Sequence, residues 1–195
     1  MSASTADIAL SCQPNREAGS FLFPYTVTNN SAADVYVFDA VPSVDAATRQ
    51  TRIDPDRVTI ALAEDGYVHV LKGIPPLPPD RDVAVQIIPL TAKLPPGGSL
   101  QRTLRVPLPF AEASAYFTDL PLRQYEQVDI KGVIFAVQFL RATIPGLAAA
   151  PDAFGAELFR VVTPNTAAQA QLVSQTFATK GLSILKRKDA FPRPR

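Results

Sequence analysis

Two stretches near the N-terminus alternate between apolar and polar positions with the period of a β-strand. Apolar and aromatic residues fill every second position of residues 21–28, FLFPYTVT, and the alternation resumes in residues 35–38, VYVF. Because successive side chains of a strand point to opposite faces, both segments are predicted strands that each have a face to bury. Asn29, Asn30 and Ser31 between them are typical turn residues. We therefore expect the two strands to form a hairpin.

The same kind of pattern recurs along the rest of the chain. Further strands are predicted at 7–12, 57–63, 67–73, 83–94, 99–108, 157–162, 173–177 and 182–186. Residues 133–142, VIFAVQFLRA, are apolar on both faces, which is typical of a central strand buried between two layers. The residues expected to lie together in the core are Phe23, Val37, Phe135, Val137 and Phe139.

These segments predict an all-β fold of about nine to ten short strands. Ala-rich residues at 43–50, 110–118 and 166–173 leave room for only a few short helical turns. The spacing of the strands favours an antiparallel sandwich of two sheets that share one core. We expect residues 1–186 to form this single domain and residues 187–195 to form a basic, Pro-containing tail.

Two short stretches carry a resemblance to a known fold. Residues 20–39 contain a strand, then TNNS, then a second strand, and LPPGGSL at 94–100 precedes another alternating segment. This pattern resembles the B–C region and a later turn of immunoglobulin-like domains of bacterial type, and it is also similar to cytoplasmic proteinase-inhibitor and pilus-chaperone-like domains. The Cys–Trp–Cys hallmark of antibody domains is absent. The resemblance implies an immunoglobulin-like sandwich and assigns no functional residue.

Composition is that of a chain that can bury a core, with 47% hydrophobic and 19% charged residues. No apolar run reaches the roughly 18 residues of a membrane-spanning helix. The single cysteine, Cys12, excludes an intramolecular disulfide, and the N-terminus lacks the basic start and apolar run of a secretion signal. We therefore expect a cytoplasmic protein without a membrane span.

Few residues suggest chemistry. His69 is the only histidine, and a zinc site needs several histidines or cysteines. Cys12 has no neighbouring base to activate it. We expect structural roles for both residues, and neither a metal nor a cofactor. The loop carboxylates leave an enzyme open as an alternative; they are Asp54, Asp56, Asp80 and Asp82.

A long connection at 108–130 is rich in aromatic residues. Connections of this length without regular structure are usually packed or functional. The aromatic side chains either cover one open end of the sandwich or form an exposed patch for a partner. The candidate interaction residues in this segment are Phe110, Tyr116, Phe117 and Tyr125.

Charge is distributed unevenly along the chain. Residues 180–195 carry +5, whereas residues 1–179 carry −4. Fields of opposite sign steer association. We expect the basic end to contact an acidic surface of another subunit or of a larger assembly. The residues proposed for this contact are Lys186, Arg187, Lys188, Arg193 and Arg195.

Three function classes remain open on the sequence alone. The sequence favours a non-catalytic protein-interaction or assembly module, with a protein partner or a second copy of the chain. An inhibitor or chaperone-like domain that engages a client through a strand edge or loop is an alternative, as is an enzyme that uses loop carboxylates. Nucleic acid is disfavoured, because the basic tail has only Phe191 as an aromatic residue for stacking on bases.

Overall fold

The computed structural model describes residues 2–4, 7–44, 48, 50–78, 82–189 and 191–194. These segments contain seventeen strands, one short α-helix and one turn of 3-10 helix. The strands belong to three sheets. The all-β prediction is therefore confirmed.

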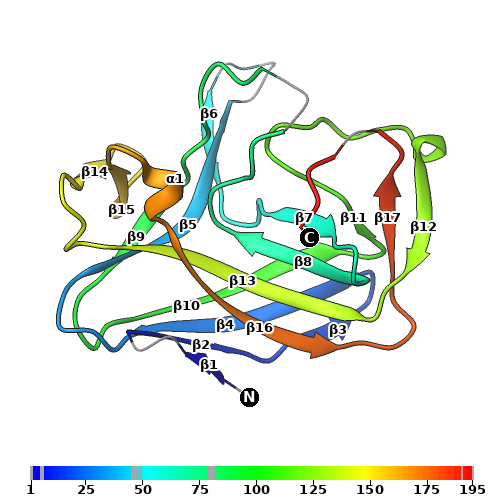
Figure 1. The fold of residues 1–195 in the computed structure, drawn as a ribbon, viewed down its shortest axis with the longest axis horizontal. Coiled ribbons are helices and arrows are strands. Elements are labelled where there is room, and N and C mark those ends of the chain that lie inside the picture. Colours follow the sequence, from blue (N-terminus) through cyan, green and yellow to red (C-terminus); the bar gives the residue numbers. More distant parts are fainter. Residues whose placement is uncertain are drawn as a thin grey trace.

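The first sheet lies along one side of the molecule (Figure 1). Its strand order is β1-β2-β4-β10, and β3 pairs with the start of β4. All of its pairings are antiparallel. The strands are β1 (Ser2–Ser4), β2 (Ile8–Cys12), β3 (Asn15–Glu17), β4 (Ser20–Asn29) and β10 (Ser99–Pro107).

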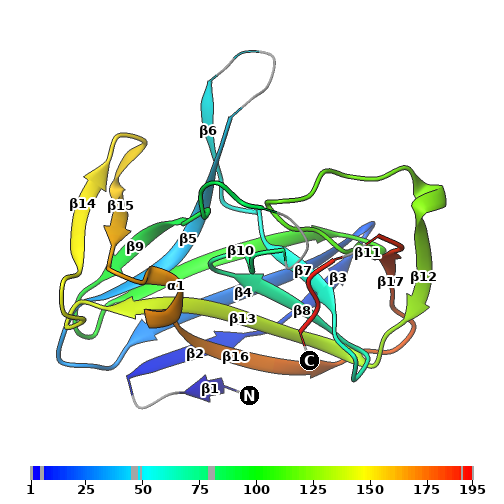
Figure 2. The same cartoon turned by 45° about the horizontal axis from the view of Figure 1, so that its top comes forward.

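The second sheet is the largest, and its main path runs β14-β15-β9-β5-β13-β8-β7. These strands are β14 (Ala148–Asp152), β15 (Gly155–Val162), β9 (Leu90–Leu94), β5 (Val35–Val44), β13 (Gly132–Arg141), β8 (Tyr67–Lys72) and β7 (Thr59–Leu62). Off this path, β16 (Gln171–Ala178) pairs with β13, and β6 (Thr51–Asp54) pairs with the far end of β5. The β5–β6 and β14–β15 pairs project from the body (Figure 2). The helix α1 (Thr166–Gln169) precedes β16.

A third, small sheet closes one end of the molecule. It consists of β11 (Phe110–Ala111), β17 (Ser183–Arg187) and β12 (Tyr125–Asp129), in the order β11-β17-β12. The 3-10 turn η1 (Leu122–Gln124) leads into β12. A backbone bridge between Ile60 and Ala113 joins this sheet to β7. The connection at 108–130 thus contains two strands where the sequence indicated no regular structure.

The pairing differs from the expected antiparallel, two-sheet arrangement. Strand β13 runs parallel to β8, and β11 runs parallel to β17. A parallel pair needs a long connection, and here the chain leaves β8, passes through β9 in the same sheet and β10 in the first sheet, and then returns as β13. A local alternation pattern does not report such long-range pairing.

Strands β4 and β5 do not form the predicted hairpin. They lie in different sheets, and the turn between them crosses the edge of the core. Asn29 holds this crossing: it is fully buried, and its side-chain Nδ2 donates to the carbonyls of Ala33 (2.8 Å) and Leu94 (2.9 Å). Its backbone N–H donates to Gly98, and its carbonyl accepts from Gly97, in the turn between β9 and β10. The β4–β5 and β9–β10 connections, which both pass between the two larger sheets, are thus joined by the hydrogen bonds of one residue.

The core follows the predicted pattern. Phe135, Val137 and Phe139 are fully buried, as are Phe23 and Val37. The rings of Phe23 and Phe135 stack at 5.1 Å between centroids, and Phe139 lies opposite Val37 in the β13–β5 register. This prediction is confirmed by the burial of these five residues and by the position of β13 between β5 and β8 in the second sheet.

Several local predictions are modified. Of residues 83–94 only β9 is a strand, since Pro89 lacks the N–H that a ladder requires. A helical turn occurs within 166–173 as α1 but not within 110–118. At 43–50, β5 continues to Val44, and most of the remainder lies outside the described residues. No helix in the described segments is long and apolar enough to cross a membrane.

Candidate functional site

The two phenylalanines proposed for interaction pack inside the molecule. Phe110 is fully buried and makes an edge contact with Phe21, 5.6 Å between ring centroids. Phe117 is 8% exposed, and its ring lies 4.9 Å from that of Phe191. These side chains cover the end of the core, which is one of the two alternatives that the sequence left open.

The two tyrosines of the same connection are half-buried and hold neighbouring loops through their hydroxyls. The Tyr116 hydroxyl accepts a hydrogen bond from the backbone N–H of Ile87 at 2.8 Å. The Tyr125 hydroxyl accepts one from the backbone N–H of Leu120 at 3.3 Å.

A buried carboxylate, Glu112, organises the C-terminal end. Its side chain is fully buried, and each of its two carboxylate oxygens accepts two hydrogen bonds. Oε1 accepts from the backbone N–H of Leu62 (3.2 Å) and from Nε of Arg193 (2.8 Å). Oε2 accepts from the backbone N–H of Arg187 (2.8 Å) and from Nη2 of Arg193 (2.7 Å). We call Glu112, Arg187 and Arg193 the Glu112 clamp.

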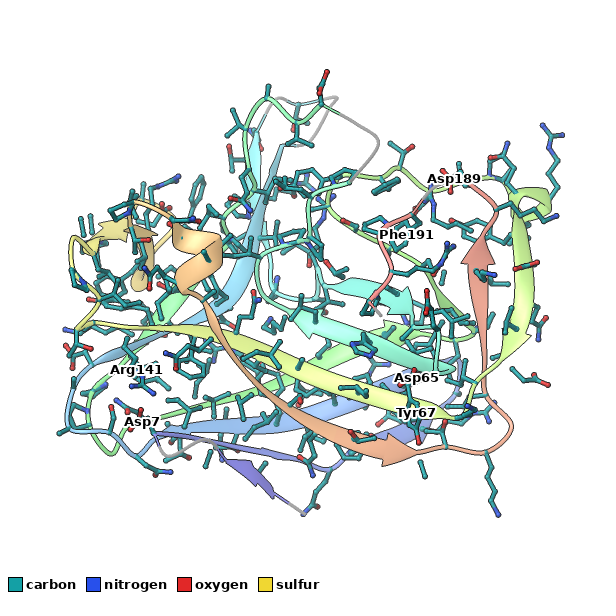
Figure 3. The ribbon with its side chains drawn as sticks, in the orientation of Figure 1. Asp7, Asp65, Tyr67, Arg141, Asp189 and Phe191 are labelled. Carbon is teal, nitrogen blue, oxygen red and sulfur yellow. The ribbon has the colours of Figure 1, made fainter. Side chains whose placement is uncertain are left out.

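The guanidinium of Arg187 is also paired within the chain. Its Nε and Nη2 each donate to Asp189 at 2.9 Å, and its Nη1 donates to the carbonyl of Thr118 at 2.9 Å. Its hydrogen bonds to Asp189 raise the pKa of the Arg187 guanidinium. Its carbon Cζ also lies 5.1 Å from the centre of the Phe117 ring. Figure 3 shows Asp189 and Phe191 at the end of the molecule that carries β12 and β17.

The remaining basic candidates are closer to the surface. Lys186 pairs with Glu126 at 2.8 Å, and Nζ of Lys188 donates to the carbonyl of Arg123 at 3.1 Å. Arg195 lies outside the described residues. Each described basic candidate thus has an acceptor within the chain, so the described residues after 186 pack against the body. The sequence reasoning missed Glu112, although an acid within the apolar run PFAEA was a usable signal.

A second cluster of charges lies between the two larger sheets, and Asp56 is its only member that the sequence had singled out. It surrounds a cavity of about 600 Å³, which we call the inter-sheet pocket. The polar residues that line it are Tyr25, Asp39, Asp56, Lys72, Arg102 and Glu157. Apolar side chains complete the walls; they include Ala40, Ile53, Leu104 and Leu158.

Strand periodicity and one irregularity place these groups together. Tyr25 on β4 lies opposite Arg102 on β10. Lys72 ends β8 on the face of Val68 and Val70, which points into the core. The pairing of β5 with β9 has an irregularity at Asp39, which lies between the paired residues Phe38 and Ala40. A bulge of this kind changes the direction in which a side chain points. The lysine at an inward position of YVHVLK was the signal that could have found this site.

Asp39 forms the centre of the cluster. The side chains of Asp39 and Lys72 are each 4% exposed, and Lys72 Nζ lies 3.5 Å from Asp39 Oδ1. Lys72 Nζ also donates to the carbonyl of Pro55 at 2.5 Å. Arg102 donates from Nε (3.2 Å) and Nη2 (3.1 Å), both to Asp39 Oδ2. One carboxylate oxygen therefore accepts two hydrogen bonds, whereas the other forms an ion pair with the Lys72 ammonium at 3.5 Å.

Two buried polar atoms of this pocket have no hydrogen-bond partner among the described residues: Tyr25 Oη and Asp39 Oδ1. Burial, followed by the charge of Asp39, raises the pKa of Tyr25, so its hydroxyl is neutral and can donate. Burial lowers the pKa of Lys72, and Asp39 opposes that effect. Shifted ionisable groups beside a cavity are typical of functional sites.

The residues considered for chemistry are dispersed. Burial raises the pKa of the Cys12 thiol to about 12, so this thiol stays protonated. His69 is half-buried on the outer face of β8 and lines an apolar groove of about 280 Å³ beside Pro192 and Pro194. Burial lowers its pKa. Of the loop carboxylates, Asp56 lines the inter-sheet pocket; Asp54 and Asp82 do not, and Asp80 lies outside the described residues.

Comparison of the chain with protein-family models, with curated proteins and with solved structures gave no match.

Proposed function

We propose that this chain is a non-catalytic interaction module that binds an extended segment of a protein partner beside β10. Two hollows support this proposal. The inter-sheet pocket and a second hollow of about 510 Å³ both include Arg102 and Glu157 in their walls. We call this combined groove, which has β10 on one side and β9 and β15 on the other, the seam.

The free edge of β10 is the observation that carries the proposal. Strand β10 ends the first sheet, so only one of its edges is paired, with β4. The Arg105 N–H points away from β4, because it reaches Asp56 Oδ1 at 3.4 Å. The Gln101 carbonyl also points away, because it accepts from Arg102 Nη1. Thr103 lies two residues from each of them, and the backbone groups of alternate residues in a strand point to the same side. The N–H and carbonyl of Thr103 therefore also face the seam.

An added strand would pair first with the N–H and carbonyl of Thr103. It would replace the side-chain contacts that Arg105 N–H makes with Asp56 and that the Gln101 carbonyl makes with Arg102. Pro24 on β4 lies opposite Thr103 and has no N–H to donate to it. This agrees with a Thr103 whose own N–H and carbonyl point away from β4. Binding of this kind uses main-chain hydrogen bonds for affinity and side-chain pockets for specificity. An inhibitor or chaperone-like role would use the same edge, with a client as the bound segment.

We also propose that the two larger sheets form an enlarged immunoglobulin-like sandwich. In that fold the B and C strands lie in opposite sheets. Strands β4 and β5 have this relation, and Asn29 holds the crossing between them.

The proposal is tested by photo-crosslinking in the cells that make the protein. A benzophenone side chain is placed at Gln101 in the seam or, as a control, at Leu122, which is 76% exposed on the opposite end. We expect one protein adduct from Gln101 and none from Leu122. In addition, Thr103→Pro removes an outward N–H and should abolish that adduct, whereas Thr103→Ala should retain it. The same adduct from Leu122, or an adduct that survives Thr103→Pro, would contradict the proposal.

A further inference from the structure

We propose that the inter-sheet pocket binds a small ligand with a neutral carboxamide head group on a short apolar body. This goes beyond partner binding at the seam, because it concerns a molecule that carries no peptide segment. It rests on three features of the pocket: its unpartnered polar atoms, its charge balance and its apolar walls.

The unpartnered atoms are the first feature. Tyr25 is 3% exposed and Asp39 is 4% exposed, yet neither Tyr25 Oη nor Asp39 Oδ1 has a hydrogen-bond partner in the described part of the chain, although Asp39 Oδ1 forms an ion pair with Lys72 at 3.5 Å. Nearly all buried polar side-chain atoms in folded proteins are paired, because leaving one unpaired costs stability. Both atoms belong to residues that line one cavity. A ligand that bonds to both would remove both costs together.

The chemistry of the two atoms defines the head group. A carboxylate oxygen only accepts hydrogen bonds, and a neutral phenol can donate one. The ligand must therefore donate from one atom and accept at another. A carboxamide does this with its NH₂ group and its carbonyl oxygen.

The charges of the pocket disfavour an ionic head group. The three acids Asp39, Asp56 and Glu157 outnumber the two bases of the pocket, and both bases are already paired with Asp39, so an anion is disfavoured. A cation at Asp39 would meet Lys72 and Arg102, which already lie against this carboxylate. A neutral head group avoids both conflicts.

The walls define the body. Ala40, Ile53, Leu104 and Leu158 supply apolar surface, and about 600 Å³ lies within the range of known small-molecule pockets. A short aliphatic chain would lie against these side chains while its head group reaches Tyr25 and Asp39.

The test is an NMR titration of the full chain with four compounds of equal carbon number: butyramide, butyrate, butylammonium and 1-butanol. We expect butyramide to give saturable amide shifts at Asp39, Arg102 and Leu158, with an affinity at least about fivefold above that of the others. Equal affinities would show an unselective apolar hollow, and the absence of saturable shifts would show a hollow filled by water only. Either result would overturn the proposal.

A pair of tyrosine variants makes the test specific. Tyr25→Phe removes only the unpartnered hydroxyl and should weaken butyramide binding about fivefold or more. Tyr116→Phe removes a hydroxyl outside the pocket and should leave butyramide binding unchanged. Unchanged binding by Tyr25→Phe would overturn the proposed head-group contact. The crosslinking experiment at the seam uses no small ligand. Its outcome therefore does not depend on butyramide binding, and either proposal can be contradicted without the other.

Discussion

The Glu112 clamp and the Asp39 cluster are built from similar parts but differ in how completely the carboxylate is bonded. Each has one buried acid bonded to an arginine side chain; a second basic residue contributes its backbone N–H at Glu112 (Arg187) and its side-chain ammonium at Asp39 (Lys72). Each carboxylate oxygen of Glu112 accepts two hydrogen bonds. Asp39 receives two hydrogen bonds from Arg102 on one oxygen, and its other oxygen has the Lys72 ammonium at 3.5 Å but no hydrogen bond in the described residues.

This difference separates a structural role from a binding role. A fully bonded buried network makes one arrangement of the chain rigid, and the clamp joins β7, β17 and the segment that follows β17. A partly bonded network beside a cavity keeps hydrogen-bonding capacity for another molecule. Buried charge alone therefore does not distinguish the two regions; the unused bonding capacity of Tyr25 and Asp39 next to open volume is what supports the proposed binding role.

The largest effect is expected from Glu112→Ala. The substitution leaves Arg193 without its carboxylate and two buried backbone N–H groups without acceptors. Breaking a buried charge pair typically costs about 3–5 kcal/mol, and we expect a loss of this size in the free energy of unfolding, measured by urea denaturation. Glu126→Ala, in an exposed pair, is the control and should leave the midpoint almost unchanged. Equal midpoints for the two variants would contradict a structural clamp.

A smaller loss is expected from Arg193→Ala. Its side chain is 26% exposed and forms two hydrogen bonds to Glu112. Hydrogen bonds to charged groups contribute about 1.5–3 kcal/mol, so we expect destabilisation by about 2 kcal/mol. Lys188→Ala is the matched change in the same segment and should have little effect, because Lys188 bonds an exposed carbonyl. If both variants unfold at the wild-type urea concentration, the C-terminal segment is not held by the clamp.

In the inter-sheet pocket, removal of a polar atom should raise the free energy of unfolding rather than lower it. Tyr25→Phe deletes a buried hydroxyl that has no partner in the described segments, and we expect stability to rise by about 1 kcal/mol. Tyr116→Phe deletes a hydroxyl that accepts from Ile87 and should lower stability by a similar amount. Thermal and urea unfolding of both variants measure this difference. A loss of stability in Tyr25→Phe would show that its hydroxyl already has a structural partner.

The smallest predicted effect is a pH dependence at His69, beside the C-terminal segment. Burial lowers the pKa of His69, and the charge of Asp65 opposes this shift. As pH falls below the ordinary value of about 6.5, the unfolded chain binds a proton that the folded chain resists. The free energy of unfolding should therefore fall between about pH 7.5 and about pH 5. His69→Gln should reduce that fall, and an unaltered slope would exclude His69 as its source.

The predictability of each region depends on the range of its interactions. Alternation within ten residues was enough to identify β13 and its buried aromatic residues, and the predicted strands at 57–63 and 67–73 contain β7 and β8, which pair with each other. Alternation does not report which strands pair. The parallel β8–β13 pair and the crossing at Asn29 both depend on segments far apart in the chain.

The candidate residues show the same limit. The sequence predicted that the basic end contacts an acidic surface of another subunit or assembly. It did not indicate Glu112, the acid within the chain, because Glu112 lies 75 residues before Arg187 and 81 before Arg193. In the pocket, Lys72 was accessible to prediction, because the alternation of β8 places it inward beside Val70. Asp39 was not, because its position depends on a bulge that the local pattern does not reveal.

The most direct test of the contrast between these two regions is a crystal structure of the chain soaked with butyramide. The predicted result is one butyramide in the inter-sheet pocket, with its NH₂ group within hydrogen-bond distance of Asp39 Oδ1 and its carbonyl oxygen within that distance of Tyr25 Oη. The bonds of Glu112 to Arg187 and Arg193 should be unchanged. A pocket that holds only water, or butyramide bound without contact to Asp39 and Tyr25, would contradict the assignment of this pocket as a binding site.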